Sequence, residues 1–175
     1  MRYMLRSLLL LSGTLSCSQI YSNATPVLST PAINEKIDSI VIIKNTRQMS
    51  VFHKGRLLKS YRVCLGPQPI GAKHFKGDGK TPEGLYYING KNPGSHYHKA
   101  LAVSYPSPGD MKYAAAHGLP AGGDIKIHGL PNGFGKDGQD DVKDDWTLGC
   151  IALTDEAIDE VYNHAAVGTR VNILP

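Results

Sequence analysis

DWTLGCIAL, residues 145–153, joins a small glycine and a cysteine to a short apolar run. The run 150–153 is typical of a short buried strand. Thr154 follows with an N-cap hydroxyl and two acidic residues behind it, so a helix is expected directly after the strand. Apolar residues keep helical spacing through this segment, at Ile158, Val161 and Tyr162, and Gly168 is expected to close it. Cys150 therefore begins a strand that leads into a helix, and the rest of the fold is interpreted around this unit.

Most of the remaining elements are predicted to be strands. Alternation and β-branched content favour them over 40–43, 48–52, 57–65, 84–88, 100–105, 124–128 and 170–174. A second helix is expected over 110–117, and the glycine- or aspartate-rich stretches 66–81 and 130–145 are expected to be loops, which at that length are usually functional or disordered. The sequence thus predicts a mainly β fold, an antiparallel β-sandwich or barrel with one or two short α-helices.

Composition divides the chain into three parts. Residues 1–24 are predicted to be a secretory signal peptide, because they combine two arginines, a leucine-rich run and small residues at 22–24. A retained membrane anchor and lipid attachment at Cys17 are the alternatives. Residues 25–36 mix proline, serine and threonine without periodicity and are expected to be a linker. Residues 37–175 are then one globular domain, exported to the periplasm or cell envelope.

Charge and cysteine content narrow the possible partners. Without residues 1–24 the chain keeps 17 basic and 15 acidic side chains, a formal charge of +2, which is too weak to indicate nucleic-acid binding. Membrane contact is expected only through the N-terminal signal. Cys64 and Cys150 remain, and in an oxidising compartment they could form a disulfide, whose geometry the sequence cannot test.

His128 and Cys150 have the residue types needed for nucleophilic catalysis. His128 ends the alternating run 125–128, and Gly129 after it permits an unusual backbone turn. A thiol attacks a carbonyl only as the thiolate, and a neighbouring imidazole is a common means of generating it at neutral pH. Gly149 lets substrate or backbone come close, and the N–H groups of Gly149 and Cys150 could form an oxyanion hole.

Two other classes of function are open. His96, His98 and His117 could bind zinc together with His128 and Cys150, but no His-Glu-X-X-His pattern is present, and we expect neither a metal nor a cofactor. The acidic stretch from Asp137 to Asp145 lacks a calcium-loop ligand pattern and is interpreted as a solvated loop. A non-catalytic wall-binding module would instead use tyrosines to line a groove: Tyr86, Tyr87, Tyr97, Tyr105 and Tyr113.

The paired segments Ile127-His128-Gly129 and Thr147-Leu148-Gly149-Cys150 resemble the signature of the YkuD-type L,D-transpeptidase catalytic domain, with 18 residues between His128 and Thr147. Residues 47–51 and 63–66 resemble the opening hairpin of that family. Gly77-Asp78-Gly79-Lys80-Thr81-Pro82-Glu83-Gly84 resembles its Thr-Pro-X-Gly loop. The resemblance covers residues 37–175, nearly the whole chain after the expected signal and linker.

The resemblance implies a periplasmic enzyme that acts on peptidoglycan stem peptides, with a role in cell-wall biogenesis and cell shape. The protein is expected to be a monomer. It implies that Cys150 attacks the carbonyl of the diamino acid at position three, expels the terminal D-alanine and holds a thioester, while His128 acts as general base. A backbone carbonyl, here that of Gly129, would orient the imidazole. Thr147 is expected to position the cysteine loop by hydrogen bonding.

The chain departs from the family pattern at Leu148, where many members carry histidine, and it lacks the arginine that often follows the cysteine. Leucine cannot donate a hydrogen bond or help to recognise a carboxylate. The acceptor is therefore open: an amine, giving a 3-3 cross-link or attachment of a protein or D-amino acid, or water, giving a stem-peptide hydrolase.

Overall fold

The computed structural model describes residues 32–134 and 144–175. Within these ranges the chain forms eight strands and two helices: β1 (Ile37–Ile43), β2 (Gln48–His53), β3 (Arg56–Arg62), β4 (Gly84–Ser95), β5 (His98–Val103), α1 (Pro108–Ala116), β6 (Lys126–His128), β7 (Ile151–Ala152), α2 (Asp155–His164) and β8 (Ala165–Leu174). The predicted mainly β architecture with two short helices is confirmed. The expected signal peptide and the residues 137–141 of the acidic stretch lie outside the described residues.

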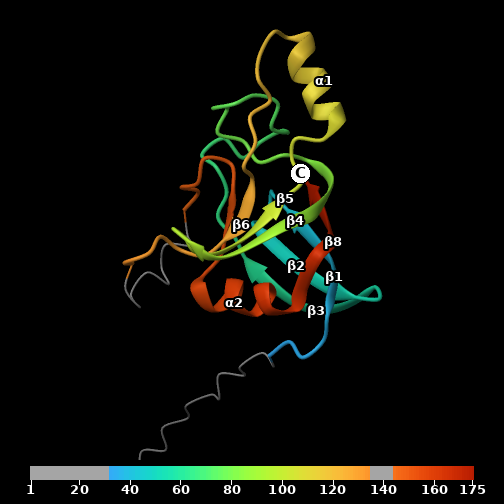
Figure 1. Ribbon diagram of the computed structural model, residues 1–175, viewed down its shortest axis with the longest axis vertical. Coiled ribbons are helices and arrows are strands. Elements are labelled where there is room, and N and C mark those ends of the chain that lie inside the picture. Colours follow the sequence, from blue (N-terminus) through green and yellow to red (C-terminus); the bar gives the residue numbers. More distant parts are fainter. Residues whose placement is uncertain (1–31, 135–143) are drawn as a thin grey trace, which may run out of the picture.

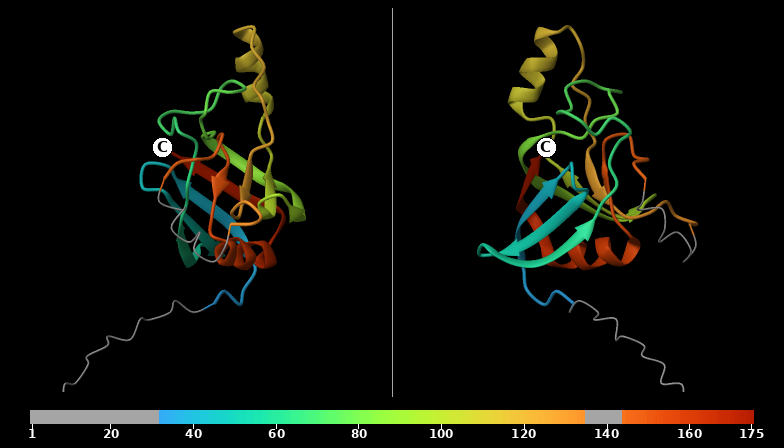
Figure 2. Two further views of the ribbon diagram at one scale, coloured as in Figure 1. Left: turned by 90° about the vertical axis from the view of Figure 1, so that its left-hand side faces the viewer. Right: turned by 180° about the vertical axis from the view of Figure 1, so that it is seen from behind.

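The strands form one curled sheet in the order β3-β2-β1-β8-β4-β5-β6-β7. The pairs β1–β8 and β6–β7 are parallel, and the other neighbours are antiparallel. Long β4 pairs first with β8 and then with β5, so it carries the sheet around a corner (Figure 1). Beyond β3, Cys64 exchanges main-chain hydrogen bonds of 3.0 and 2.9 Å with Ala152 of β7. The two ends of the sheet therefore meet, and the sheet approaches a closed barrel (Figure 2).

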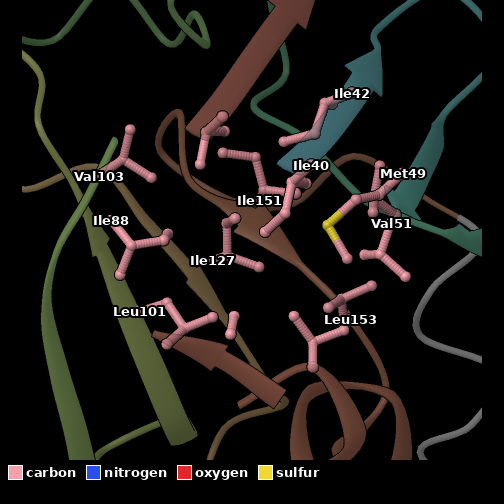
Figure 3. Packing of buried hydrophobic residues seen from close by; sticks show 14 of the residues in the cluster. Ile40, Ile42, Met49, Val51, Ile88, Leu101, Val103, Ile127, Ile151 and Leu153 are labelled. Carbon is pink, nitrogen blue, oxygen red and sulfur yellow. The ribbon is translucent and has the colours of Figure 1, made fainter. Parts of the chain in front are cut away.

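The core fills the interior of this curled sheet. Ile127 of β6 and Ile151 of β7 are register partners, both fully buried, and their side chains lie close to those of Ile40 and Leu101 (Figure 3). Successive side chains of a strand point to opposite faces. Since Ile127 and Ile151 face the core, the residues next to them, His128 and Cys150, are directed to the other face of this strand pair.

The two helices lie at opposite ends of the molecule (Figure 1). The Ser107 hydroxyl accepts from the Asp110 N–H, and the Asp110 carboxylate accepts from the Ser107 N–H, so a capping box starts α1, which projects from the barrel. Thr154 caps α2, which covers the other end through buried Ile158 and Val161. Neither described helix is long and apolar enough to cross a bilayer.

The main differences from the sequence prediction concern β4 and the junction of α2 with β8. β4 continues past residue 88 to Ser95, through Gly90 and Pro93. The register between β4 and β5 is irregular near both residues, and this irregularity accommodates extra residues in β4 and the N–H donor that proline lacks. Gly168 does not close α2, because the helix ends at His164 and β8 starts at once. Gly168 instead takes a φ of +92° inside β8, where its register with β1 shifts.

The predicted linker also differs in part from the structure. Ile33, within 25–36, is 8% exposed and belongs to the core cluster. Its N–H donates to Glu160 of α2 at 2.5 Å. The segment just before β1 is therefore packed against the domain rather than extended away from it.

Candidate active site

Cys150 and His128 line one cavity of about 710 Å³. Its walls come from β6 and the segment before it, the segment that leads into β7, the end of β4 with the turn after it, and the loop between β3 and β4. His128 is 4% exposed, whereas the Cys150 side chain is partly open to the cavity. The short parallel pair β6–β7 thus brings together two residues that lie 22 positions apart in the sequence.

The thiol of Cys150 is hydrogen-bonded to main-chain groups. It donates to the Asp124 carbonyl at 3.5 Å, and the Lys126 N–H donates to its sulfur. Desolvation by burial is the largest influence on the Cys150 pKa and raises it above its ordinary value. The bond that Cys150 donates in this structure is to Asp124 and not to His128. Cys150 is therefore a neutral thiol at rest, in the same cavity as the imidazole.

The main chain at the end of β6 fixes the orientation of the His128 ring. Its Nδ1 lies 2.7 Å from the Gly129 carbonyl. A carbonyl only accepts, so Nδ1 carries the proton and Nε2 has the lone pair that can accept a proton. Rings of Tyr97 and Trp146 lie 4.5 and 5.9 Å from the imidazole, centroid to centroid. Burial lowers the pKa of His128 below its usual value, so the ring stays neutral and basic at neutral pH.

Thr147 connects the two ends of the turn formed by residues 147–150, which we call the cysteine turn. Its buried hydroxyl donates to the Cys150 carbonyl at 2.8 Å and accepts from the Gly149 N–H at 3.2 Å. The Gly149 N–H is therefore already hydrogen-bonded. It could donate to an oxyanion only after this long hydrogen bond to Thr147 is broken. The N–H of Cys150 itself is the better placed donor of the two amides expected for that role.

At both glycines next to the proposed catalytic residues, a side chain would come too close to neighbouring atoms. At Gly149 φ is +119°, and a Cβ there would lie 2.4 Å from the Lys80 carbonyl oxygen. The loop between β3 and β4 therefore touches the cysteine turn directly. Gly129, by contrast, does not have a positive φ. It is needed because a Cβ would lie 2.5 Å from an Asp155 carboxylate oxygen.

The sequence pattern did not indicate Trp146 as a residue of the site, and it indicated Tyr97 only as a possible groove residue and not as a neighbour of His128. Tyr97 and Trp146 enclose His128 and stack on each other at 6.0 Å, although they come from segments far apart in the chain. Asp145 accepts from Arg47 at 2.6 Å and from the Leu65 N–H at 2.9 Å, which ties the cysteine segment to the first hairpin. The polar Asp145 before an apolar run was the one available sequence signal.

The alternative sites receive little support from the structure. In the described ranges no group of three or more His, Cys, Asp or Glu residues is arranged to hold a metal ion. His98 pairs with Asp159 at 2.7 Å, and His117 stacks on Tyr113 of α1. Cys64 and Cys150 are both thiols. Of the five tyrosines proposed for a groove, the cavity wall contains Tyr97.

Comparison with known proteins identifies the family. The model of the YkuD family, the L,D-transpeptidase catalytic domain, matches residues 37–173. The chain belongs to this family. It is 33% identical over 129 residues to the Putative L,D-transpeptidase YafK of Escherichia coli (strain K12), across 70% of this chain and 45% of YafK.

Two solved structures share the fold. Pgp2, the helical cell shape determining protein from Campylobacter jejuni, aligns with a TM-score of 0.60 and 28% identity, over 80% of this chain and 48% of Pgp2. The L,D-transpeptidase from Xylanimonas cellulosilytica DSM 15894 aligns with a TM-score of 0.52 and 13% identity, over 82% of this chain and 63% of that chain. The chain spans about half the length of YafK and of Pgp2.

Proposed function

We propose that the protein is an exported cysteine acyltransferase of the cell wall that forms a thioester on Cys150 from a peptidoglycan stem peptide. The observation that carries this proposal is the placement of Cys150 and His128 on the same face of β6–β7, lining one cavity, with Nδ1 of the histidine fixed by Gly129. Membership in the L,D-transpeptidase family supports the same chemistry. Export follows from the signal peptide predicted over residues 1–24, and a monomer is the proposed state.

In the first half-reaction, His128 Nε2 takes the thiol proton as the sulfur attacks the carbonyl of the diamino acid at position three. The carbon–sulfur bond forms, and the carbonyl electrons move to oxygen, which the Cys150 N–H stabilises. Collapse of this intermediate breaks the peptide bond, and the imidazolium of His128 gives its proton to the departing D-alanine amine. The products are the thioester and free D-alanine, with His128 neutral again.

In the second half-reaction, an acceptor attacks the thioester while His128 takes a proton from it. The carbon–sulfur bond then breaks, and that proton returns to the Cys150 sulfur. An amine acceptor yields a cross-link or an attached protein or D-amino acid, and water yields a trimmed stem peptide. Transfer is the function proposed here, because Leu148 is 86% exposed at the cavity and presents an apolar surface that favours a bulky acceptor over water.

The test is incubation of the protein with defined disaccharide tetrapeptides and separation of the products by mass. We expect cross-linked dimers and released D-alanine, with an acyl adduct on Cys150 visible in the intact protein at short times. A carbapenem should acylate the same residue. Cys150→Ala should abolish both adducts, whereas Cys64→Ala, which changes the other thiol of the domain, should keep them.

Two outcomes would redirect the proposal. Trimmed tripeptides without dimers, at saturating amine, would make the protein a stem-peptide hydrolase of the same fold. Full product formation by Cys150→Ala would remove the thioester mechanism altogether. Binding to peptidoglycan without any turnover by the wild-type protein would indicate a wall-binding module.

A further inference from the structure

A carboxylate of α2 is hydrogen-bonded to the peptide unit that orients His128. The carbonyl of this unit, from Gly129, accepts the hydrogen bond of His128 Nδ1 at 2.7 Å. The N–H of the same unit, from Leu130, donates to Asp155 Oδ1 at 2.8 Å. One planar peptide unit therefore separates the imidazole from the carboxylate, with a hydrogen bond at each end.

The fold holds the chain around this peptide unit from several sides. The Leu153 N–H donates to the His128 carbonyl at 2.9 Å. The Gly129 N–H donates to the Tyr97 carbonyl at 3.1 Å. Both are main-chain contacts, whereas the Leu130 N–H is bound by a side chain. The contact with the carboxylate is therefore one that a single substitution can change without altering the others.

Asp155 is placed to bind this peptide unit rather than to cap its own helix or touch a substrate. It is the first residue of α2, but the Thr154 hydroxyl provides the cap by accepting from the Ala157 N–H at 3.3 Å. Gly129 leaves room for the carboxylate, because a Cβ there would lie 2.5 Å from Asp155 Oδ1. Among the described residues, those that line the cavity do not include Asp155. Any influence of its charge on the reaction must therefore pass through His128.

A carboxylate at one end of a peptide unit strengthens the acceptor at the other end. Hydrogen bonds to ionised groups are stronger than those between neutral groups, and bonds arranged in a chain polarise one another. Burial lowers the pKa of His128, and the bond to the Gly129 carbonyl opposes this effect. The opposition grows when the carbonyl oxygen carries more negative charge. It matters most while His128 is an imidazolium, because a positive charge then faces the carboxylate across the peptide unit.

We propose that Asp155 is a positioning residue that supports His128 through the Gly129–Leu130 peptide unit, fixing the ring and stabilising the imidazolium that forms when Cys150 is deprotonated. This inference rests on the proposed function and adds a carboxylate to the machinery of its proton transfer. The proton on Nδ1 stays there throughout. Nε2 takes the thiol proton and returns it to the leaving amine, and no proton passes to the peptide unit or to Asp155.

A second carboxylate on α2 provides a matched comparison. The Asp155 and Asp159 side chains are 39% and 41% exposed. Asp155 Oδ2 lies 3.9 Å from His98 Nδ1, beyond hydrogen-bond distance, whereas Asp159 binds His98 Nε2 and Lys99 Nζ, each at 2.7 Å. The two acids thus share their helix, their exposure and their cationic neighbours, and they differ in the bond to the peptide unit.

The experiment titrates His128 itself, whose ring is faced by Tyr97, Cys150 and the charge of Lys126. In protein with labelled histidine, the ring resonance that disappears in His128→Gln is followed by NMR between about pH 4 and 8. Asp155→Asn keeps an oxygen that can accept from the main chain but removes the charge. The pKa of His128 should therefore fall by about half a pH unit, since the lost carboxylate is partly exposed.

The same substitution should slow the reaction without weakening substrate binding. In Asp155→Asn, formation of the Cys150 thioester from a tetrapeptide donor at neutral pH should be about fivefold to tenfold slower, with KM changed by less than about twofold. Asp159→Asn should keep the His128 pKa and the acylation rate of the wild type. Asp155→Glu retains the charge and should keep the His128 pKa above that of Asp155→Asn.

The sign of the pKa shift separates this role from a merely structural one. A loosened site would admit water and raise the pKa of His128 toward 6.5, the opposite of the expected fall. An unchanged or raised pKa in Asp155→Asn, or an equal fall in Asp159→Asn, would overturn the inference. Absence of turnover by a wild-type protein whose His128 titrates as expected, and responds to Asp155→Asn, would count against the proposed function alone.

Discussion

At the scale of single residues, the environment of Cys150 and His128 keeps both groups neutral before substrate binds. Burial raises the pKa of the thiol and lowers the pKa of the imidazole, so the two shifts both oppose a resting thiolate–imidazolium pair. The thiol donates to Asp124 meanwhile. In the proposed mechanism, deprotonation therefore accompanies attack, after the sulfur has rotated from Asp124 toward His128.

This predicts slow and pH-dependent alkylation of Cys150. Because its pKa lies above the ordinary value of 9.0, the thiolate fraction should rise about tenfold per pH unit between pH 7 and 9. Iodoacetamide labelling of the Cys150 peptide, followed by mass spectrometry, should show that slope without a plateau. A plateau near neutral pH would mean that an ion pair exists at rest.

Tyr97 is predicted to set the acid limit of activity. Its ring packs 4.5 Å from His128, and burial of the imidazole is the main cause of its lowered pKa. Tyr97→Ala should admit water, raise that pKa toward 6.5 and move the acid limb of kcat/KM to higher pH. At pH 5.5 activity should be lost by at most about tenfold, and at pH 8 the loss should be much smaller. Tyr97→Phe keeps the ring and should keep the wild-type profile; a shift of equal size in both variants would contradict this role.

At the scale of elements, the cysteine turn depends on contact with the loop between β3 and β4. Gly149 touches the Lys80 carbonyl, and Thr147 joins the two ends of the turn through its hydroxyl. The position of the sulfur is therefore set by a neighbouring loop as much as by β7. Both features depend on backbone approach between segments distant in sequence.

Gly149→Ala should distort this contact and reduce both stability and activity. Gly168 is the matched control, because it also has a positive φ, +92°, but a Cβ at that position would meet nothing within 4 Å. Gly168→Ala should cost about 1–2 kcal/mol from the backbone conformation alone. Gly149→Ala should cost clearly more in urea unfolding and should lower kcat, since the main chain of Lys80 or Cys150 must move. Equal destabilisation by both variants would show that the close contact is unimportant.

The elements also show what the sequence could predict. Local patterns sufficed for the hairpin of β2 and β3 and for the Thr154 cap of α2, because periodicity and capping act over a few residues. The long course of β4 and the junction of α2 with β8 were missed, because tertiary pairing overrides the local signals of Gly90, Pro93 and Gly168. His128 and Cys150 could be proposed from residue type and family resemblance. Their aromatic surroundings depend on the curl of the sheet, which no local pattern encodes.

At the scale of the whole molecule, closure of the sheet brings the site together. The bridge between Cys64 and Ala152 joins the two ends of the sheet, and Asp145 binds Arg47 across the same junction. At the other end of the barrel, Glu160 of α2 accepts from Lys59 at 2.7 Å and Tyr61 at 2.9 Å, both in β3. It also accepts from the Ile33 N–H. A carboxylate on α2 therefore holds β3 and the segment before β1 in place.

Glu160 should make the stability of the fold depend on pH. Burial alone would raise the pKa of its carboxyl, but the bonds from Lys59, Ile33 and Tyr61 hold that pKa below its ordinary value of 4.5. A lowered folded-state pKa contributes stability that is complete above pH 4.5 and is lost as the pH falls through the folded value. Glu160→Gln should therefore reduce the free energy of unfolding by about 1.5–3 kcal/mol at pH 7, and by progressively less below pH 4.5.

Urea unfolding of both proteins between pH 7 and pH 3 measures this difference. Glu156→Gln changes an exposed acid on the same helix and should shift stability by less than about 0.5 kcal/mol throughout. If the Glu160→Gln deficit stayed constant down to pH 3, its origin would be the altered shape of the side chain. Protonation removes from the wild type the same charge that the substitution removes. If the link between α2 and β3 depends on that charge, the free energies of unfolding of the two proteins must therefore converge in acid.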